Sequence, residues 1–96
     1  MMLALVGCGA GLEFAESQAE AACAWHARCE TLELAGFADE AECLERLEDA
    51  VAKRQEAGEL QCDSYDASAA DACLAVYAET ACDVVPDFTI CEDVCD

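Results

Sequence analysis

The chain has 96 residues, a length that suits a single domain, and it combines a net charge of −18 with nine cysteines. Its 22 acidic residues face only four basic ones, and so strong a negative charge repels phosphate backbones, which excludes nucleic acid as a partner. Alanine supplies 21 of the apolar residues, so large core side chains are scarce and something besides hydrophobic burial must brace the fold.

The first eight residues are apolar, uncharged and end in small residues, as the end of a secretory signal does. Within them, Leu5-Val6-Gly7-Cys8 resembles the signal of bacterial lipoproteins, with Leu at −3, Gly at −1 and Cys at +1. The resemblance implies cleavage before Cys8, acylation of its sulfur and new amino group, and membrane contact only through this lipid. No Lys or Arg precedes Cys8, so on this interpretation the signal begins upstream. The alternative is an ordinary buried or unpaired cysteine.

Residues 9–11, Gly-Ala-Gly, are typical of a short tether, and residues 12–96 are expected to form one disulfide-rich helical domain. A first helix is predicted over residues 12–34. Its inward face repeats every three or four residues and comprises Ala15, Ala19, Ala22, Trp25, Cys29 and Leu32. Gly36 suits the left-handed residue just past the end of a helix.

A second helix is predicted from Asp39, whose carboxylate can cap the first turn while Glu42 reaches back in a capping box. Gly58 is expected to end it. Two acid-to-base pairs lie four residues apart along this helix, which favours ion pairing: Glu42–Arg46 and Asp49–Lys53.

A third helix is predicted to start near Asp66 or Ser68 and to be closed by Pro86, the only proline. A last short turn is expected from Thr89, which has capping spacing to Glu92. No segment alternates as a strand does. The predicted fold is therefore all-α, a small disulfide-stapled three-helix array with a short C-terminal helical turn.

Setting Cys8 aside leaves an even number of cysteines, which are predicted to form disulfides in an oxidising compartment: Cys23, Cys29, Cys43, Cys62, Cys73, Cys82, Cys91 and Cys95. Eight cysteines allow about 105 pairings. A hairpin about Gly36 favours Cys29–Cys43, because these two lie nearly equidistant from the turn. Cys23 could then face Cys73. In the tail, Cys91 and Cys95 are expected to tie to two different elements, with Cys62 and Cys82 as available partners.

Metal binding is the rival interpretation, because His26 lies midway between Cys23 and Cys29. Cys91 and Cys95 could complete a four-ligand shell, and acidic clusters could hold divalent cations. The usual Cys-x2-Cys knuckle is absent, so the sequence predicts neither a metal nor another cofactor. A third interpretation is a redox or thiol-exchange protein with one exposed, reactive bridge.

Catalysis is not expected from this chain. A single His, three Ser and bridged cysteines suggest no nucleophile with a base beside it. The aromatic residues are expected to serve packing rather than a partner-binding patch: Trp25, Tyr65, Tyr77 and Phe88.

Three segments carry a resemblance to a known group: Cys23-x5-Cys29-Glu30, Glu42-Cys43 and Tyr65-Asp66-x3-Ala70-x2-Cys73-Leu74. Together they resemble the small secreted lipoproteins, rich in Cys, Ala and acidic residues, of myxobacteria and related deltaproteobacteria. The resemblance implies an envelope location and a helical disulfide-bonded body, and it assigns no active residue. The sequence thus predicts a noncatalytic structural or interaction protein outside the cytoplasm: periplasmic, anchored to the outer membrane, or secreted.

Overall fold

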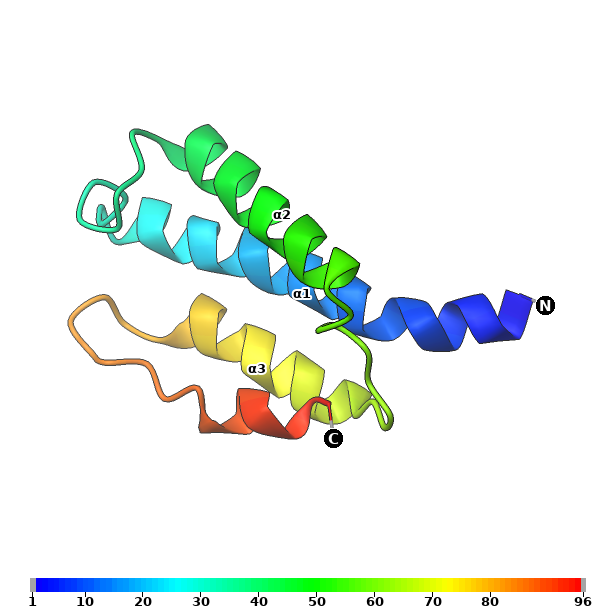
Figure 1. The fold of residues 1–96 in the computed structure, drawn as a ribbon. Coiled ribbons are helices and arrows are strands. Elements are labelled where there is room, and N and C mark those ends of the chain that lie inside the picture. Colours follow the sequence, from blue (N-terminus) through cyan, green and yellow to red (C-terminus); the bar gives the residue numbers. More distant parts are fainter. Residues whose placement is uncertain (1, 96) are drawn as a thin grey trace.

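The computed structural model describes the backbone of residues 2–95 and the side chains of residues 11–95. Three α-helices and a terminal 3-10 turn make up the fold (Figure 1): α1 (Met2–Arg28), α2 (Glu40–Glu56), α3 (Ala67–Glu79) and η1 (Thr89–Asp93). Within the described backbone, β pairing is limited to one isolated bridge between Tyr65 and Cys95. The all-α prediction, with three helices and a C-terminal turn, is confirmed.

Helix α1 organises the molecule, because α2 and α3 each pack against it while making no helix–helix contact with one another in the described part of the chain. The N-terminal end of α1 extends past the other elements, whereas the two loops that follow α1 and α3 lie together at the opposite end (Figure 1). The array is therefore two helix pairs that share α1.

Each pair has a small core of its own. The first cluster joins α1 to α2 and the loop beyond it, through Ala15, Ala19, Val51 and Leu60. The second joins α3 to η1 through Ala69, Ala70, Cys73 and Val94, with Phe14 of α1 packed against it. The largest fully buried side chains are one valine and three cysteines, so sulfur does much of the packing that large aliphatic side chains do elsewhere.

The N-terminal boundary of α1 differs from the prediction. Residues 9–11 were expected to form a flexible tether, but they are helical, and Gly11 is buried. A Cβ at Gly11 would overlap the carbonyl oxygen of Leu60, so a glycine at this position lets the loop after α2 lie directly on α1. The glycine serves close packing rather than flexibility.

The C-terminal boundary of α1 also differs, because the helix ends at Arg28 and not near Leu34. Glu30 is left-handed, with φ of 57°. Thr31 N–H donates to the His26 carbonyl at 2.9 Å and Glu30 N–H to the Ala27 carbonyl at 3.3 Å. These two bonds are the Schellman pattern that satisfies the last carbonyls of a helix. A glutamate usually continues a helix, which is why the sequence pattern overran this end.

Two further Schellman turns use Gly36, which was expected to be left-handed, and Gly58, which was expected to end the second helix. Gly36 has φ of 95° and closes the short turn before α2, and Gly58 has φ of 76° and follows α2. The N-terminus of α2 is capped as predicted, since Asp39 Oδ1 accepts from Glu42 N–H at 2.8 Å. Glu42 reaches back to Ala38 N–H at 2.9 Å, one residue before the cap.

The two predicted ion pairs on α2 have different outcomes. Lys53 and Asp49 are paired at 3.0 Å on the surface. Arg46 does not pair with Glu42 but donates to the Gly36 carbonyl at 2.9 Å, with its guanidinium 5.1 Å from the centroid of the Phe37 ring. The arginine thus fastens the preceding turn, because a backbone carbonyl and an aromatic face are both within its reach.

Helix α3 starts after Asp66, whose Oδ1 accepts from Ala69 N–H at 3.0 Å, so the cap is Asp66 and not Ser68. It ends at Glu79, before the predicted limit at Pro86, because Thr80 is already extended. The C-terminal turn begins at Thr89 as expected, but Thr89 does not cap it, because the capping position is Phe88 and the Phe88 side chain makes no capping hydrogen bond. The first amide of the turn is bound by Asp87, whose carboxylate accepts from Thr89 N–H at 3.0 Å and from Thr89 Oγ1 at 2.6 Å.

Candidate functional site

Four disulfides connect the elements and use all eight cysteines predicted to be bridged: Cys23–Cys43, Cys29–Cys82, Cys62–Cys95 and Cys73–Cys91. They join α1 to α2, the end of α1 to the loop after α3, the loop before α3 to the C-terminus, and α3 to η1. Since disulfides persist where thiols are not kept reduced, this framework indicates an oxidising, extracytoplasmic environment.

The predicted pairing of Cys29 with Cys43 is wrong. Because α1 stops at Arg28, Cys29 lies in the turn beyond the helix and reaches Cys82, with a Cα separation of 5.3 Å. Cys43 instead meets Cys23 across the α1–α2 contact, at 5.8 Å. The hairpin is not centred on Gly36, so equal distance along the chain from that glycine did not mean proximity in space.

The suggested pairing of Cys23 with Cys73 is also wrong, because Cys73 faces η1 and bonds to Cys91. The tail is tied to two different elements, as expected. Cys62 is the partner of Cys95, but Cys82, the other suggested partner for the tail, is used by Cys29.

The bridges differ in accessibility. Both sulfurs of Cys23–Cys43 are enclosed, since each residue is 0% exposed, and Cys73 is equally buried beside half-buried Cys91. The other two bridges each combine a half-buried cysteine with an exposed one, Cys82 or Cys95. Two disulfides therefore belong to the core, and two are open to reagents from solution.

Arg28 lies beside the exposed Cys29–Cys82 bridge. Its Nη2 donates to the carbonyls of Tyr77 at 2.9 Å and Thr80 at 3.1 Å, and its Nη1 lies 3.8 Å from Cys82 Sγ. A guanidinium here satisfies the unpaired carbonyls at the end of α3 and offsets the negative pole of the helix. This role could not be predicted from the sequence, because Arg28 is 49 or more residues away from each of these partners.

Trp25 and the other aromatic residues serve packing to different degrees. Trp25 is half-buried, and its Nε1 donates to the Thr80 carbonyl at 3.4 Å. Tyr77 and Phe88 stack at a tilt, with ring centroids 4.7 Å apart. Tyr65 is 40% exposed, and its backbone pairs in the isolated β-bridge with Cys95. Trp25 and Tyr77 therefore line one shallow groove between α1 and α3, whereas Tyr65 lies apart beside Cys95.

His26, the proposed metal ligand, is engaged locally. Its Nδ1 lies 2.7 Å from Thr31 Oγ1, and its ring packs edge-on against Trp25. The neighbouring Cys23 and Cys29 are both in disulfides and offer no thiolate. Among the described residues, no group of three or more His, Cys, Asp or Glu side chains is placed to hold a metal ion.

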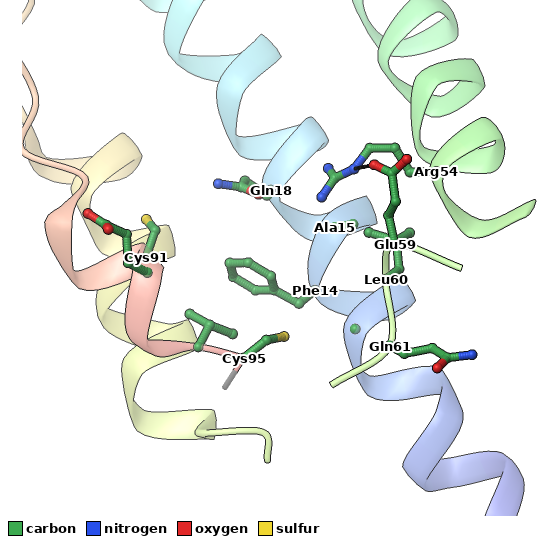
Figure 2. Close-up of a pocket in the computed structure, with 12 residues that line it drawn as sticks. Phe14, Ala15, Gln18, Arg54, Glu59, Leu60, Gln61, Cys91 and Cys95 are labelled. Carbon is green, nitrogen blue, oxygen red and sulfur yellow. Dashed lines mark ion pairs between the residues drawn. The ribbon is translucent and has the colours of Figure 1, made fainter. Parts of the chain in front are cut away.

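A groove of about 290 Å³ lies between α1, the loop after α2 and the C-terminal segment (Figure 2). Phe14 projects into it from α1, and Leu60 and Val94 line it from the two other segments. Arg54 and Glu59 form an ion pair of 3.9 Å at its rim. The sequence did not indicate this groove, because its walls come from three distant segments. Its lining includes the charged residues Arg54, Glu59 and Glu92 but no Ser, His or free thiol.

Acidic side chains cover the surface, and one has a perturbed pKa. The pKa of Asp87 is lowered by the hydrogen bond from the Thr89 hydroxyl, and further by the bond from the Thr89 amide. Both bonds stabilise the carboxylate form. Asp87 is fully exposed, so this perturbation belongs to the local turn rather than to an active site.

The predicted lipidation residue, Cys8, lies outside the residues whose side chains are described. Its backbone belongs to the N-terminal part of α1. Within the described residues, no helix combines the length and the apolar character needed to span a membrane.

Comparisons with protein-family models, with curated proteins and with solved structures found no significant match to this chain.

Proposed function

We propose that this chain is a noncatalytic structural or interaction protein of the bacterial cell envelope, anchored through a lipid on Cys8. The observation that carries the proposal is the disulfide framework, with buried sulfur in both halves of the core. A fold braced in this way is suited to a compartment that keeps thiols oxidised.

The position of Cys8 supports the anchoring part of the proposal. Cys8 belongs to the N-terminal part of α1, and the loops after α1 and α3 lie at the far end of the molecule (Figure 1). A lipid on Cys8 would hold the N-terminal end at the membrane surface and direct the far end outward. Anionic lipids repel a body with a net charge of −18, which favours such an upright orientation.

The described side chains also support a noncatalytic role. His26 is bound to Thr31, the eight bridged cysteines are not free nucleophiles, and no Ser, His or free thiol lines the groove beside Phe14. The feature best suited to recognising a partner is the acidic surface of the protein, which would attract a cationic partner.

Metabolic labelling with an alkyne fatty acid tests the anchor. The gene is expressed with its own upstream sequence, as wild type and as Cys8→Ser. We expect label and membrane fractionation in the wild type only, and four intact disulfides in both proteins. Equal labelling of both proteins, or no labelling of either, would overturn the assignment of Cys8.

Thiol counting tests the compartment separately. Protein purified without reductant should react with alkylating reagent at none of the eight bridged cysteines. Eight reactive thiols would refute the extracytoplasmic assignment. Elemental analysis after dialysis addresses the metal-binding alternative, since a disulfide-bonded protein should retain no stoichiometric transition metal.

A further inference from the structure

The Cys29–Cys82 bridge differs from the other three disulfides in its electrostatic surroundings. Cys82 is exposed, and its sulfur lies 3.8 Å from Arg28 Nη1. Among the described side chains, it is the only bridged sulfur that receives a hydrogen bond from a cation. We propose that Cys29–Cys82 is a thiol–disulfide exchange site whose substrate is a thiol and whose positioning residue is Arg28.

The guanidinium is held beside the sulfur by two other bonds. Arg28 Nη2 donates to the carbonyls of Tyr77 and Thr80, at 2.9 and 3.1 Å, so the charge is positioned before any thiol arrives. The C-terminal end of a helix is an unfavourable place for an anion, and Cys82 closely follows the C-terminal end of α3. Arg28 reverses this local disadvantage, because it binds the same terminal carbonyls that make the helix end negative.

The exchange proceeds in two balanced steps. The thiolate of an incoming thiol attacks the exposed Cys82 sulfur, which breaks the bridge, forms a mixed disulfide and releases Cys29 as a thiolate. A second thiolate then attacks the substrate sulfur of the mixed disulfide and releases Cys82 as a thiolate. Two electrons pass from the two thiols to the bridge, their two protons go to Cys29 and Cys82, and the substrate leaves as a disulfide.

Arg28 can act in both steps. In the first step its charge attracts the incoming thiolate toward Cys82, and in the second it stabilises the departing Cys82 thiolate. The other accessible bridge, Cys62–Cys95, provides an internal comparison. It has one exposed cysteine as well, but no cation among the described residues donates to either of its sulfurs. Exposure alone therefore does not distinguish the two bridges, whereas the guanidinium does.

Opening the bridge would disconnect the end of α1 from the loop after α3. The single tryptophan reports on this contact, because Trp25 Nε1 donates to the Thr80 carbonyl at 3.4 Å. Reduction should release this bond and shift tryptophan emission to longer wavelength. The inference does not depend on the lipid anchor, since the bridge joins the C-terminal end of α1 to the loop after α3, whereas Cys8 belongs to the N-terminal part of α1.

Partial reduction with differential alkylation tests the proposal. The full oxidised chain is treated with dithiothreitol, a small dithiol whose thiolate is the attacking species, and samples are quenched early with an alkylating reagent. Peptide mass spectrometry then gives the opening rate of each bridge. We expect Cys29 and Cys82 to be labelled first, together with the shift in Trp25 emission. Earlier or simultaneous labelling of Cys62 and Cys95 would overturn the proposal.

Substitution of the arginine separates an electrostatic role from a structural one. Arg28→Gln should slow the opening of Cys29–Cys82 by about two- to fivefold, the effect of one charge interaction near a protein surface. Arg46→Gln is the matched control, since Arg46 also donates to a loop carbonyl but touches no sulfur, and it should leave the rate unchanged. Faster opening in Arg28→Gln would show that the arginine is only a clamp, and an unchanged rate would show that it has no role.

Discussion

Removal of the buried Cys23–Cys43 bridge is expected to destabilise the protein severely. The bridge closes a loop of 20 residues, so the Cys23→Ala/Cys43→Ala double variant should lose about 3 kcal/mol through greater freedom of the unfolded chain. Both cysteines are 0% exposed, and each sulfur removed from the core costs about 1 kcal/mol more in lost packing. The total, about 5 kcal/mol, is comparable with the whole stability of a small domain.

A second double variant separates buried sulfur from loop closure. Cys62→Ala/Cys95→Ala opens a longer loop, of 33 residues, which corresponds to about 4 kcal/mol, but its sulfurs are half-buried or exposed and contribute little packing. Loop closure alone would make this variant the less stable of the two. Buried sulfur reverses the order, so we expect the Cys23→Ala/Cys43→Ala variant to be the less stable.

Serine substitutions sharpen the same comparison. At positions 23 and 43, replacing the alanines by serines should cost a further 1–3 kcal/mol or so, because hydroxyl groups enter a fully enclosed site. At positions 62 and 95 the same change should have little effect, since water is within reach. Urea unfolding followed by circular dichroism at 222 nm measures all four variants. If the variant without Cys23–Cys43 retained wild-type stability within about 1 kcal/mol, the sulfur-based core would be refuted.

Three further changes test local features of the fold. Glu30→Gly should stabilise the protein by about 1 kcal/mol in urea unfolding, because Glu30 occupies a left-handed position, and a loss of stability would contradict this reading of the end of α1. Gly11→Ala should destabilise it by about 1–2 kcal/mol despite the better helix propensity of alanine, because the new methyl group meets the Leu60 carbonyl; a more stable variant would show that the contact is loose. Thr89→Val should raise the pKa of Asp87 toward 3.8, as measured by carboxyl NMR titration. Because the folded-state pKa is lowered, Asp87 stabilises the fold above its unfolded-state pKa and loses this contribution as the pH falls through the folded-state value; an unchanged titration in the valine variant would contradict the hydrogen-bond assignment.

Local chemistry explains how much of this fold could be predicted from the sequence. Asp39 and Asp66 mark helix starts because a cap needs only a side-chain oxygen and an amide three residues later. Gly36 and Gly58 mark turns because a left-handed residue is easiest for glycine. The number of cysteines and the scarcity of large apolar residues indicated a helical body braced by disulfides, and the four bridges agree with that expectation.

The disulfide pairing and the surroundings of each bridge depended on tertiary structure. Cys29 pairs with Cys82 and not with Cys43, because α1 ends before the left-handed residue Glu30. A left-handed turn at Glu30 could not be predicted, because glutamate rarely adopts that conformation. Gly11 and Leu60 meet only because the loop after α2 returns to α1. Arg28 lies beside Cys82 only because α1 and α3 pack together. Caps and turns are set by neighbours along the chain, whereas bridges and charge contacts are set by where helices cross, and the crossing depends on every packed side chain at once.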